Sequence, residues 1–241
     1  MHEALNNKKI IISGGSSGIG LATAKRLSKR GAEIIVVSRC KEKLDRAKND
    51  IGGKCKAYSL DVTDEKAVDD FFSDVGRFDH LVTAAAGAAL GGFTELESQT
   101  AISLVESKLW GQYFCAKYAV PQLNDGGSIT FFSGIVSRKP MVGASAYAII
   151  AGAMESLTRS LALELAPVRV NCITPGVIDT PVWAELLPDD LRKEQFESIA
   201  SMLPVNRLGS PDDVSQAVEY VIGNRFVSGS IVDVDGGHRV V

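Results

Sequence analysis

The sequence predicts a doubly wound α/β fold, with a parallel sheet of seven strands and helices on both of its faces. Short β-rich apolar runs alternate along the chain with longer stretches in which apolar residues recur every three or four positions. The runs are nearly continuously apolar, which is typical of strands buried on both faces of a parallel sheet. Repeated strand–helix units of this kind favour the doubly wound arrangement. No linker rich in proline or serine divides the 241 residues, so we expect a single domain over residues 1–241.

The first half of the chain provides four of the expected strands, at residues 9–13, 33–38, 54–60 and 80–83. The first strand reads Lys-Ile-Ile-Ile-Ser and runs directly into a glycine-rich turn. Helical periodicity between the strands predicts helices at residues 19–30, 42–51 and 65–75.

The second half continues the alternation, with strands expected at residues 128–133, 168–173 and 230–234 and helices at 100–123, 146–166 and 211–222. Residues 181–208 form a long irregular stretch with a helical pattern of its own. Its apolar side chains, Trp183 and Phe196 among them, suit a helical lid over a substrate site within the domain. The alternative is that they pack on the sheet or on a partner subunit.

Composition and charge exclude several classes of protein. The chain has 26 basic and 29 acidic residues, a formal net charge of -3, which offers no attraction to nucleic acid or to an anionic membrane. Its four cysteines and three histidines are scattered, without the spacing of a disulfide scaffold or a metal site. No apolar stretch approaches the roughly 18 residues of a spanning helix, and no signal peptide is recognisable. We expect a cytoplasmic protein with a small-molecule partner and no metal.

The segment after the first expected strand is the most informative one. It reads Ser-Gly-Gly-Ser-Ser-Gly-Ile-Gly over residues 13–20 and opens the first helix. Glycines let the backbone turn sharply and approach a pyrophosphate, which the positive end of the helix attracts. Plain turn chemistry is the alternative, but the position after the first strand favours dinucleotide binding. The expected contacts are Gly14, Ser16, Ser17, Gly18, Ile19 and Gly20.

Several motifs occur together in the order and spacing of one known family. They are the glycine loop, Asp61-Val62, Ala86-Gly87, Tyr147, Pro175-Gly176 and the terminal Val234-Asp235-Gly236-Gly237. In this respect the whole chain resembles the short-chain dehydrogenase/reductase family. The resemblance implies a seven-stranded Rossmann sheet, a nicotinamide dinucleotide cofactor and a homodimer or homotetramer.

The end of the second strand bears on which dinucleotide binds. An acidic side chain there would accept hydrogen bonds from the adenosine ribose and repel a 2'-phosphate. This sequence has Ser38 followed by Arg39, and a guanidinium matches phosphate geometry, so the pair favours NADP(H). The alternative is that Arg39 is a solvated charge at the start of a helix.

The resemblance also implies further cofactor contacts. Asp61 and Val62 correspond to adenine contacts, and the residues after the fourth strand, Ala85, Ala86 and Gly87, lie where the family also contacts the cofactor. The nicotinamide cradle corresponds to Pro175, Gly176, Ile178 and Thr180. Thr180 also suits the N-cap of a following helix, because Pro181 would take the first helical position.

The catalytic positions depart from the family pattern. The family has a tyrosine, a lysine four residues later, a serine thirteen residues earlier and an asparagine on the fourth helix. Here Tyr147 is present, but Ala151 replaces the lysine, Gly134 stands at the serine position beside Ser133, and Lys108 occupies the asparagine position.

Two functions follow from these departures. The first is an NADP(H)-dependent oxidoreductase acting on a small apolar carbonyl or alcohol, with Lys108 supplying the missing cation, lowering the pKa of Tyr147, and with Ser133 doing the serine's work. The second is a catalytically silent NADP(H)-binding redox sensor or regulatory subunit. In that case Lys108 is a solvated or interface charge, Tyr147 only packs, and Ser133 is structural.

Overall fold

The computed structural model describes residues 5–85, 87 and 89–241, and within them seven parallel strands form one sheet. The strand order is β3-β2-β1-β4-β5-β6-β7, so the expected doubly wound Rossmann fold is confirmed. The strands are β1 (Lys9–Ser13), β2 (Glu33–Ser38), β3 (Cys55–Ser59), β4 (Phe78–Thr83), β5 (Leu123–Phe132), β6 (Arg169–Pro175) and β7 (Ile231–Val234).

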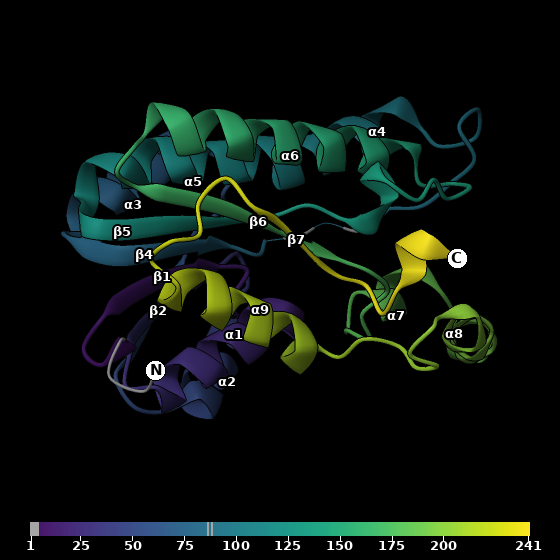
Figure 1. Ribbon diagram of the computed structural model, residues 1–241, viewed down its shortest axis with the longest axis horizontal. Coiled ribbons are helices and arrows are strands. Elements are labelled where there is room, and N and C mark those ends of the chain that lie inside the picture. The colour runs from purple at the N-terminus through teal and green to yellow at the C-terminus, as the bar shows by residue number, and fades with distance from the viewer. Residues whose placement is uncertain (1–4, 86, 88) are drawn as a thin grey trace.

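Helices cover both faces of the sheet (Figure 1). One layer contains α1 (Gly18–Lys29), α2 (Lys41–Ile51) and α9 (Pro211–Gly223). The opposite layer contains α3 (Glu65–Val75), α4 (Ser98–Val105), α5 (Gly111–Ala119) and α6 (Ser145–Glu164).

The apolar core consists of two clusters, one on each face of the sheet. On β1, the Ile11 side chain belongs to the cluster beneath α3, α5 and α6, while Ile10 and Ile12 belong to the cluster beneath α1, α2 and α9. All three are fully buried. A strand whose alternate side chains enter two cores is apolar at every position, which explains the continuous runs in the sequence.

The strand order reverses between β1 and β4, which lie side by side in the middle of the sheet. The chain moves outward from β1 to β2 and β3, then returns to the other side of β1 as β4. The loops that leave the carboxyl ends of β1 and β4 therefore diverge. Ligands of open α/β sheets bind in the crevice that this divergence creates.

The expectation of a single helix at residues 100–123 is wrong in detail. The structure interrupts it with one π-helical turn, Glu106–Trp110 (the π turn), between α4 and α5. After α5 the chain makes a short 3-10 turn and enters β5 at Leu123, five residues before the expected strand start at residue 128. A π turn adds a residue without breaking the helical path, so apolar periodicity did not reveal it.

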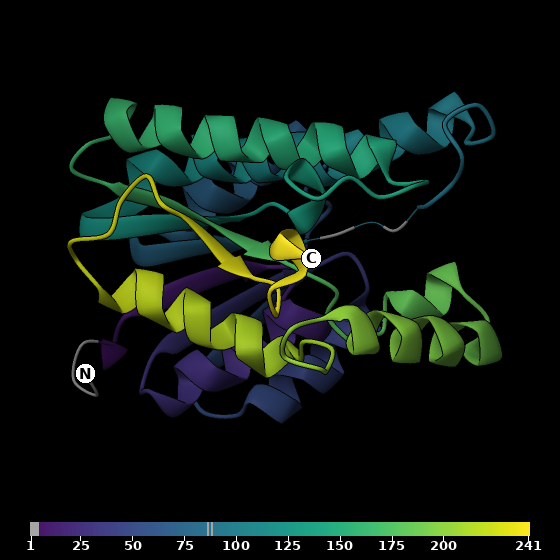
Figure 2. The ribbon, with the colours of Figure 1, turned by 45° about the vertical axis from the view of Figure 1, so that its right-hand side comes forward.

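Residues 181–208 contain two helices, α7 (Trp183–Leu186) and α8 (Asp189–Met202), which stand away from the sheet in both views (Figures 1 and 2). The Trp183 ring packs edge-on against Phe196 at a centroid distance of 5.6 Å. Leu203 is the one buried residue of this segment. Within the described residues, no helix combines the length and the apolar composition needed to cross a bilayer.

His80 on β4 is a titratable group enclosed in the sheet. Its side chain is 5% exposed, and its Nδ1 lies 2.9 Å from Ser128 Oγ on β5. Burial lowers the pKa of His80 from 6.5 to about 4. Between these two pH values the unfolded chain binds a proton at this residue and the folded chain does not, so stability falls as the pH falls.

We therefore expect the free energy of unfolding to drop by about 2 kcal/mol between pH 7 and pH 5 through His80 alone. Urea unfolding at the two pH values measures this drop. His80→Asn, which keeps a polar group next to Ser128, should remove most of it. An equal drop in the wild type and the variant would contradict the assignment.

Candidate active site

A cavity of about 580 Å³ lies at the carboxyl ends of the strands. Its walls come from the glycine loop, the segments after β2, β3, β4, β5 and β6, the π turn, α6 and α7. Of the site residues predicted from sequence, it is lined by Gly14, Ser16, Ser17, Gly18, Ile19, Ser38, Arg39, Asp61, Val62, Ala85, Gly87, Lys108, Ser133, Tyr147, Pro175, Gly176, Ile178 and Thr180. Gly20 is not among the lining residues, and Ala86 lies outside the described residues.

The glycine loop requires glycine for two different reasons. Gly14 has a φ of +70°, and a Cβ on it would lie 2.5 Å from the Ala84 backbone; a Cβ on Gly20 would lie 2.3 Å from the Gly14 oxygen. Those two glycines let the loop and α1 pack closely. Gly18, at φ +50°, has open space, since a Cβ there would meet only the Thr180 side chain, at 3.5 Å. Gly18 therefore keeps the cavity clear.

The start of α1 offers positive potential to this cavity. Its N-cap residue, Ser17, makes no side-chain capping hydrogen bond, and the first turn contains no acidic residue. Backbone N–H groups at a helix start lack intrahelical acceptors, and the helix dipole adds partial positive charge there. The residues present therefore fit a diphosphate.

Two cations, Arg39 and Lys43, line the cavity between the end of β2 and the first turn of α2. Ser16 Oγ donates a hydrogen bond to Ser38 Oγ at 2.9 Å, which ties the glycine loop to this strand end. Arg39 lines the cavity beside them, and so does Lys43, in the first turn of α2. Lys43 was not among the residues predicted from the sequence, although its position four residues after Arg39 could have indicated it.

Among the described residues that line the cavity, two are acidic: Asp61, just after β3, and Glu185 on α7. Asp61 Oδ1 accepts hydrogen bonds from the backbone N–H and the hydroxyl of Thr63, at 3.0 and 2.8 Å. Val62 packs closely on α5, because a Cβ on Gly111 would lie 2.7 Å from its side chain. This contact fixes the floor of the cavity next to the π turn.

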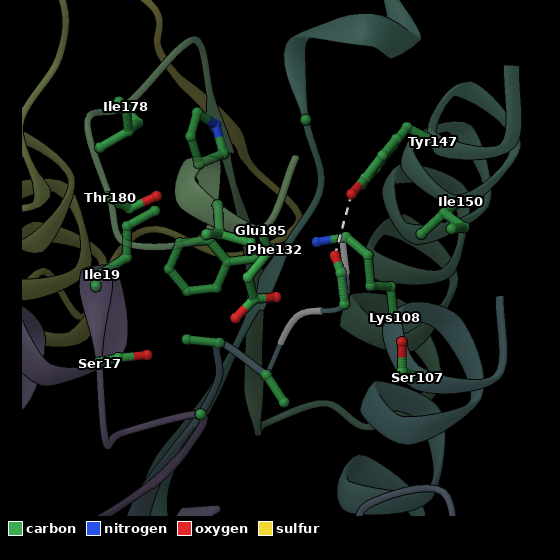
Figure 3. Close-up of a pocket in the computed structure, with 18 of the residues that line it drawn as sticks. Ser17, Ile19, Ser107, Lys108, Phe132, Tyr147, Ile150, Ile178, Thr180 and Glu185 are labelled. Carbon is green, nitrogen blue, oxygen red and sulfur yellow. Dashed lines mark hydrogen bonds between the residues drawn. The ribbon is translucent and has the colours of Figure 1, made fainter. Parts of the chain in front are cut away.

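The side chains of Tyr147 on α6 and Lys108 on the π turn lie next to one another in the cavity, opposite Ile19 and Thr180 (Figure 3). Lys108 Nζ lies 5.4 Å from the centroid of the Tyr147 ring, within the range of a cation–π contact. The Tyr147 hydroxyl donates to the Gly87 carbonyl at 3.1 Å and accepts from the Ala89 N–H at 3.2 Å. The predicted proximity of Tyr147 and Lys108 is therefore present in the structure.

Gln112 fixes the backbone that presents Lys108. Its Nε2 donates to the Lys108 carbonyl at 2.5 Å and to the Phe132 carbonyl at 2.9 Å. Its Oε1 accepts from Thr83 Oγ1 at 2.7 Å and from the Phe132 N–H at 2.9 Å. The side chain thus connects the π turn to the ends of β4 and β5. No sequence motif indicated this role.

The electrostatic environment of the pair differs from the sequence-based expectation. The Lys108 ammonium has no ion-pair or hydrogen-bond partner among the residues that the structure describes, and burial lowers the pKa of Lys108 to about 8. Burial raises the pKa of Tyr147, and the Ala89 N–H offsets only part of this rise. The expected lowering of the Tyr147 pKa is therefore not found in the free protein, where burial sets the direction of the shift.

Ser133 is directed towards α6. Its hydroxyl donates to the Ala151 carbonyl at 3.1 Å and lies 3.4 Å from Glu155 Oε1. Glu155 is 7% exposed and also accepts from Ser137 Oγ at 2.5 Å and from Arg138 at 3.2 Å. Glu155 was not among the residues predicted from the sequence, although it follows Tyr147 by two helical turns on the same face of α6.

The segment after β6 is shaped by close packing. A Cβ on Gly176 would lie 2.8 Å from the Asp235 backbone, so this position accepts only glycine without movement. Trp183 Nε1 donates to the Ile178 carbonyl at 2.9 Å. The interpretation of Thr180 as an N-cap is wrong, because α7 begins at Trp183 after Val182, and Thr180 contributes its carbonyl oxygen rather than its side chain.

Comparison with known proteins identifies the family. Residues 14–239 match the protein family described as enoyl-(acyl carrier protein) reductase. The cis-4-hydroxycyclohexanecarboxylate dehydrogenase of Sinomonas cyclohexanicum is 33% identical over 255 residues, which cover 100% of both chains. A solved short chain dehydrogenase/reductase family protein has a TM-score of 0.90 at 30% identity, covering 99% of this chain and 100% of its own. The chain belongs to the short-chain dehydrogenase/reductase family.

As a short-chain dehydrogenase/reductase, the protein is an NAD(P)-dependent oxidoreductase. A small-chain dehydrogenase solved in complex with NADPH is similar to it, with a TM-score of 0.85 and 33% identity, covering 98% of this chain and 100% of that chain. In this short-chain dehydrogenase/reductase, Ala151 lies four residues after Tyr147 on α6, and its carbonyl accepts a hydrogen bond from Ser133. The ammonium beside the tyrosine is that of Lys108.

Proposed function

We propose that this short-chain dehydrogenase/reductase is an NADP(H)-dependent oxidoreductase that transfers a hydride between the nicotinamide and a small apolar carbonyl or alcohol. The observation that carries the proposal is the Lys108 ammonium next to Tyr147 in the same cavity as the glycine loop. A cation, a phenol and an anion-binding helix start in one cavity are the parts that reduction of a carbonyl requires.

The cofactor assignment rests on residues at four places in the cavity. The glycine loop and the start of α1 suit the diphosphate, while Arg39 and Lys43 suit a 2'-phosphate. Asp61 and Val62 suit the adenine, Pro175, Gly176, Ile178 and Thr180 suit the nicotinamide, and Ala85 and Gly87 add further cofactor contacts. The bound dinucleotide supplies or accepts the hydride. The NADPH complex of a similar dehydrogenase supports this assignment.

The proton that the substrate oxygen gains or loses is exchanged with side chains of this chain. Tyr147 and Lys108 form the pair that exchanges it with the substrate oxygen. Ser133 holds the substrate oxygen by rotating its hydroxyl away from the Ala151 carbonyl. Both side chains are half-buried, and together they give the site proton donors at two positions.

The substrate class rests on the walls beyond the nicotinamide cradle. Leu90, Met141, Ile150, Trp183 and Leu186 line the cavity there, so an apolar substrate fits. Because α7 lines the cavity while α8 has no buried residue, the two helices suit a lid that closes over the substrate.

A second candidate function is a silent NADP(H)-binding sensor or regulatory subunit. One observation favours it: the hydroxyls of Tyr147 and Ser133 already have protein partners. A panel of apolar ketones, aldehydes and dicarbonyls with NADPH, run beside a cofactor titration, separates the two. Binding without turnover on any carbonyl would select the silent protein.

The cations at the end of β2 generate a prediction about cofactor choice. We expect NADPH to bind about 30-fold more tightly than NADH, or about 2 kcal/mol, because Arg39 makes a charge-assisted contact. Fluorescence titration of Arg39→Ala should show nearly equal affinities. Lys41→Ala removes a neighbouring charge that does not line the cavity and serves as the control. Equal affinities in the wild type would refute the NADP(H) preference.

The open space beside Gly18 generates a second prediction. We expect Gly18→Val to abolish NADPH binding while the domain stays folded, since its side chain enters the cavity opposite Thr180. Gly52→Val is the matched control, because Gly52 also has a positive φ, +63°, with nothing within 4 Å. Calorimetric titration and circular dichroism measure the two properties. Full affinity in a folded Gly18→Val protein would count against the assigned loop.

The position of Lys108 generates a third prediction. We expect Lys108→Ala to reduce turnover on the order of a hundredfold with little change in NADPH affinity, because the lost cation acts in the chemical step. Lys108→Asn combined with Ala151→Lys should restore part of the activity. The exposed, ion-paired Lys66 on α3 provides the control Lys66→Ala. A loss below threefold in Lys108→Ala would exclude Lys108 from catalysis.

A further inference from the structure

Glu155 on α6 places a buried carboxylate against the segment that follows β5. Its Oε1 accepts a hydrogen bond from Ser137 Oγ at 2.5 Å, and its Oε2 accepts one from Arg138 at 3.2 Å. The Ser133 hydroxyl is a third donor beside it, but it lies farther away, at 3.4 Å from Oε1. All three donors belong to the segment at residues 133–138, so the Glu155 carboxylate holds this segment as a unit.

Arg138 is held from a second side. Its Nη1 donates to both carboxylate oxygens of Asp233 on β7, at 2.8 Å each, and Asp233 also pairs with Arg239. The Asp233 side chain is 10% exposed. The charge of Glu155 is therefore balanced by an arginine whose position is fixed by β7.

The Ser133 hydroxyl has one proton, for which three acceptors compete during the proposed reaction. They are the Ala151 carbonyl at 3.1 Å, the Glu155 carboxylate and the substrate carbonyl. The Ala151 and substrate carbonyls are both neutral, so the substrate can displace Ala151. A carboxylate forms a hydrogen bond roughly twice as strong, so a Ser133 proton bonded to Glu155 would be lost to the substrate.

We propose that Ser137 is a positioning residue for Ser133: its hydroxyl occupies Glu155 Oε1 and keeps this oxygen from accepting the Ser133 proton. The inference rests on the proposed function, in which Ser133 holds the substrate oxygen. It is carried by the difference between 2.5 Å for Ser137 and 3.4 Å for Ser133 at the same carboxylate oxygen. Ser137 Oγ lies 3.1 Å from the Gly134 carbonyl, so its shorter contact is the one to Glu155.

Removal of the Ser137 hydroxyl changes this competition. Among the described residues, Ser133 is then the hydroxyl that remains beside Oε1. The distance of 3.4 Å exceeds that of an ordinary hydroxyl–carboxylate hydrogen bond by about 0.8 Å, which a rotation of the Ser133 side chain can close. The Ser133 proton then stays on Glu155, and the substrate oxygen loses one of its donors.

Steady-state reduction by Ser137→Ala tests the competition. We expect kcat/KM for the carbonyl substrate to fall about tenfold, because a charged acceptor outcompetes a neutral one, while NADPH affinity stays unchanged. Ser137→Thr keeps the hydroxyl and should retain the wild-type value. Ser73→Ala, at an exposed serine on α3, is the matched control. A Ser137→Ala protein within twofold of the wild type would overturn the proposal.

Two double variants separate this role from a merely structural one. In Ser137→Ala combined with Glu155→Gln, the acceptor is a neutral amide, so kcat/KM should return to within about threefold of the wild type although a second buried residue has changed. In a Ser133→Ala background, Ser137→Ala should cause no further loss, since the competing proton is gone. A further loss in either double variant would overturn the proposal.

A crystal structure of Ser137→Ala gives a readout that does not depend on activity. We expect Ser133 Oγ within about 2.8 Å of Glu155 Oε1, in place of the 3.4 Å of the wild type. A Ser133 hydroxyl that keeps its hydrogen bond to the Ala151 carbonyl would overturn the proposal.

Failure of the proposed function looks different from failure of this inference. If the wild type binds NADPH but reduces no carbonyl, the oxidoreductase assignment falls and this inference falls with it. If the wild type reduces carbonyls and Ser133→Ala lowers the rate, while Ser137→Ala does not, the function and the role of Ser133 stand and only the role of Ser137 is wrong.

Discussion

The site depends on one side chain amide, that of Gln112. It makes four hydrogen bonds, to Thr83, to both backbone groups of Phe132 and to the Lys108 carbonyl, and so satisfies every donor and acceptor it carries. A buried amide is costly when any of these bonds is missing. The ends of β4 and β5 and the π turn are therefore held in one arrangement. The places of Lys108, of the cavity floor and of Ser133 at the end of β5 follow from this arrangement.

The cavity combines two unlike ends. One end offers helix N–H groups, Arg39 and Lys43 to anionic groups and is open to solvent. The other end holds a single desolvated ammonium against a phenol. A charge in water is screened, whereas a charge taken out of water is sensitive to every ligand atom placed near it. The first end therefore suits the binding of anionic groups, and the second suits proton exchange.

The sequence predicted the fold because the continuous apolar runs leave little choice: a strand such as β1, with Ile10, Ile11 and Ile12 all apolar, needs cover on both faces. It also placed Lys108 near Tyr147, since the motif spacing survives on both helices. It did not predict the direction of the Ser133 and Tyr147 hydroxyls, because a hydroxyl follows whichever acceptor the tertiary structure brings closest. The roles of Gln112 and Glu155 were not predicted for the same reason, because most of their hydrogen-bond partners are distant in the chain or lie in loops.

Because of the π turn, the direction of the Lys108 side chain depends on the number of residues in the turn as well as on the residue type at position 108. Each residue of a helix advances the side chains by about 100° around its axis, so one residue fewer between Glu106 and Trp110 would rotate Lys108 away from the cavity. A relative with lysine at this place but an ordinary α-helical turn would present the ammonium elsewhere. Transfer of this lysine–tyrosine contact to another scaffold therefore requires an insertion together with the substitution, because a point mutation alone would not bring the ammonium to the cavity.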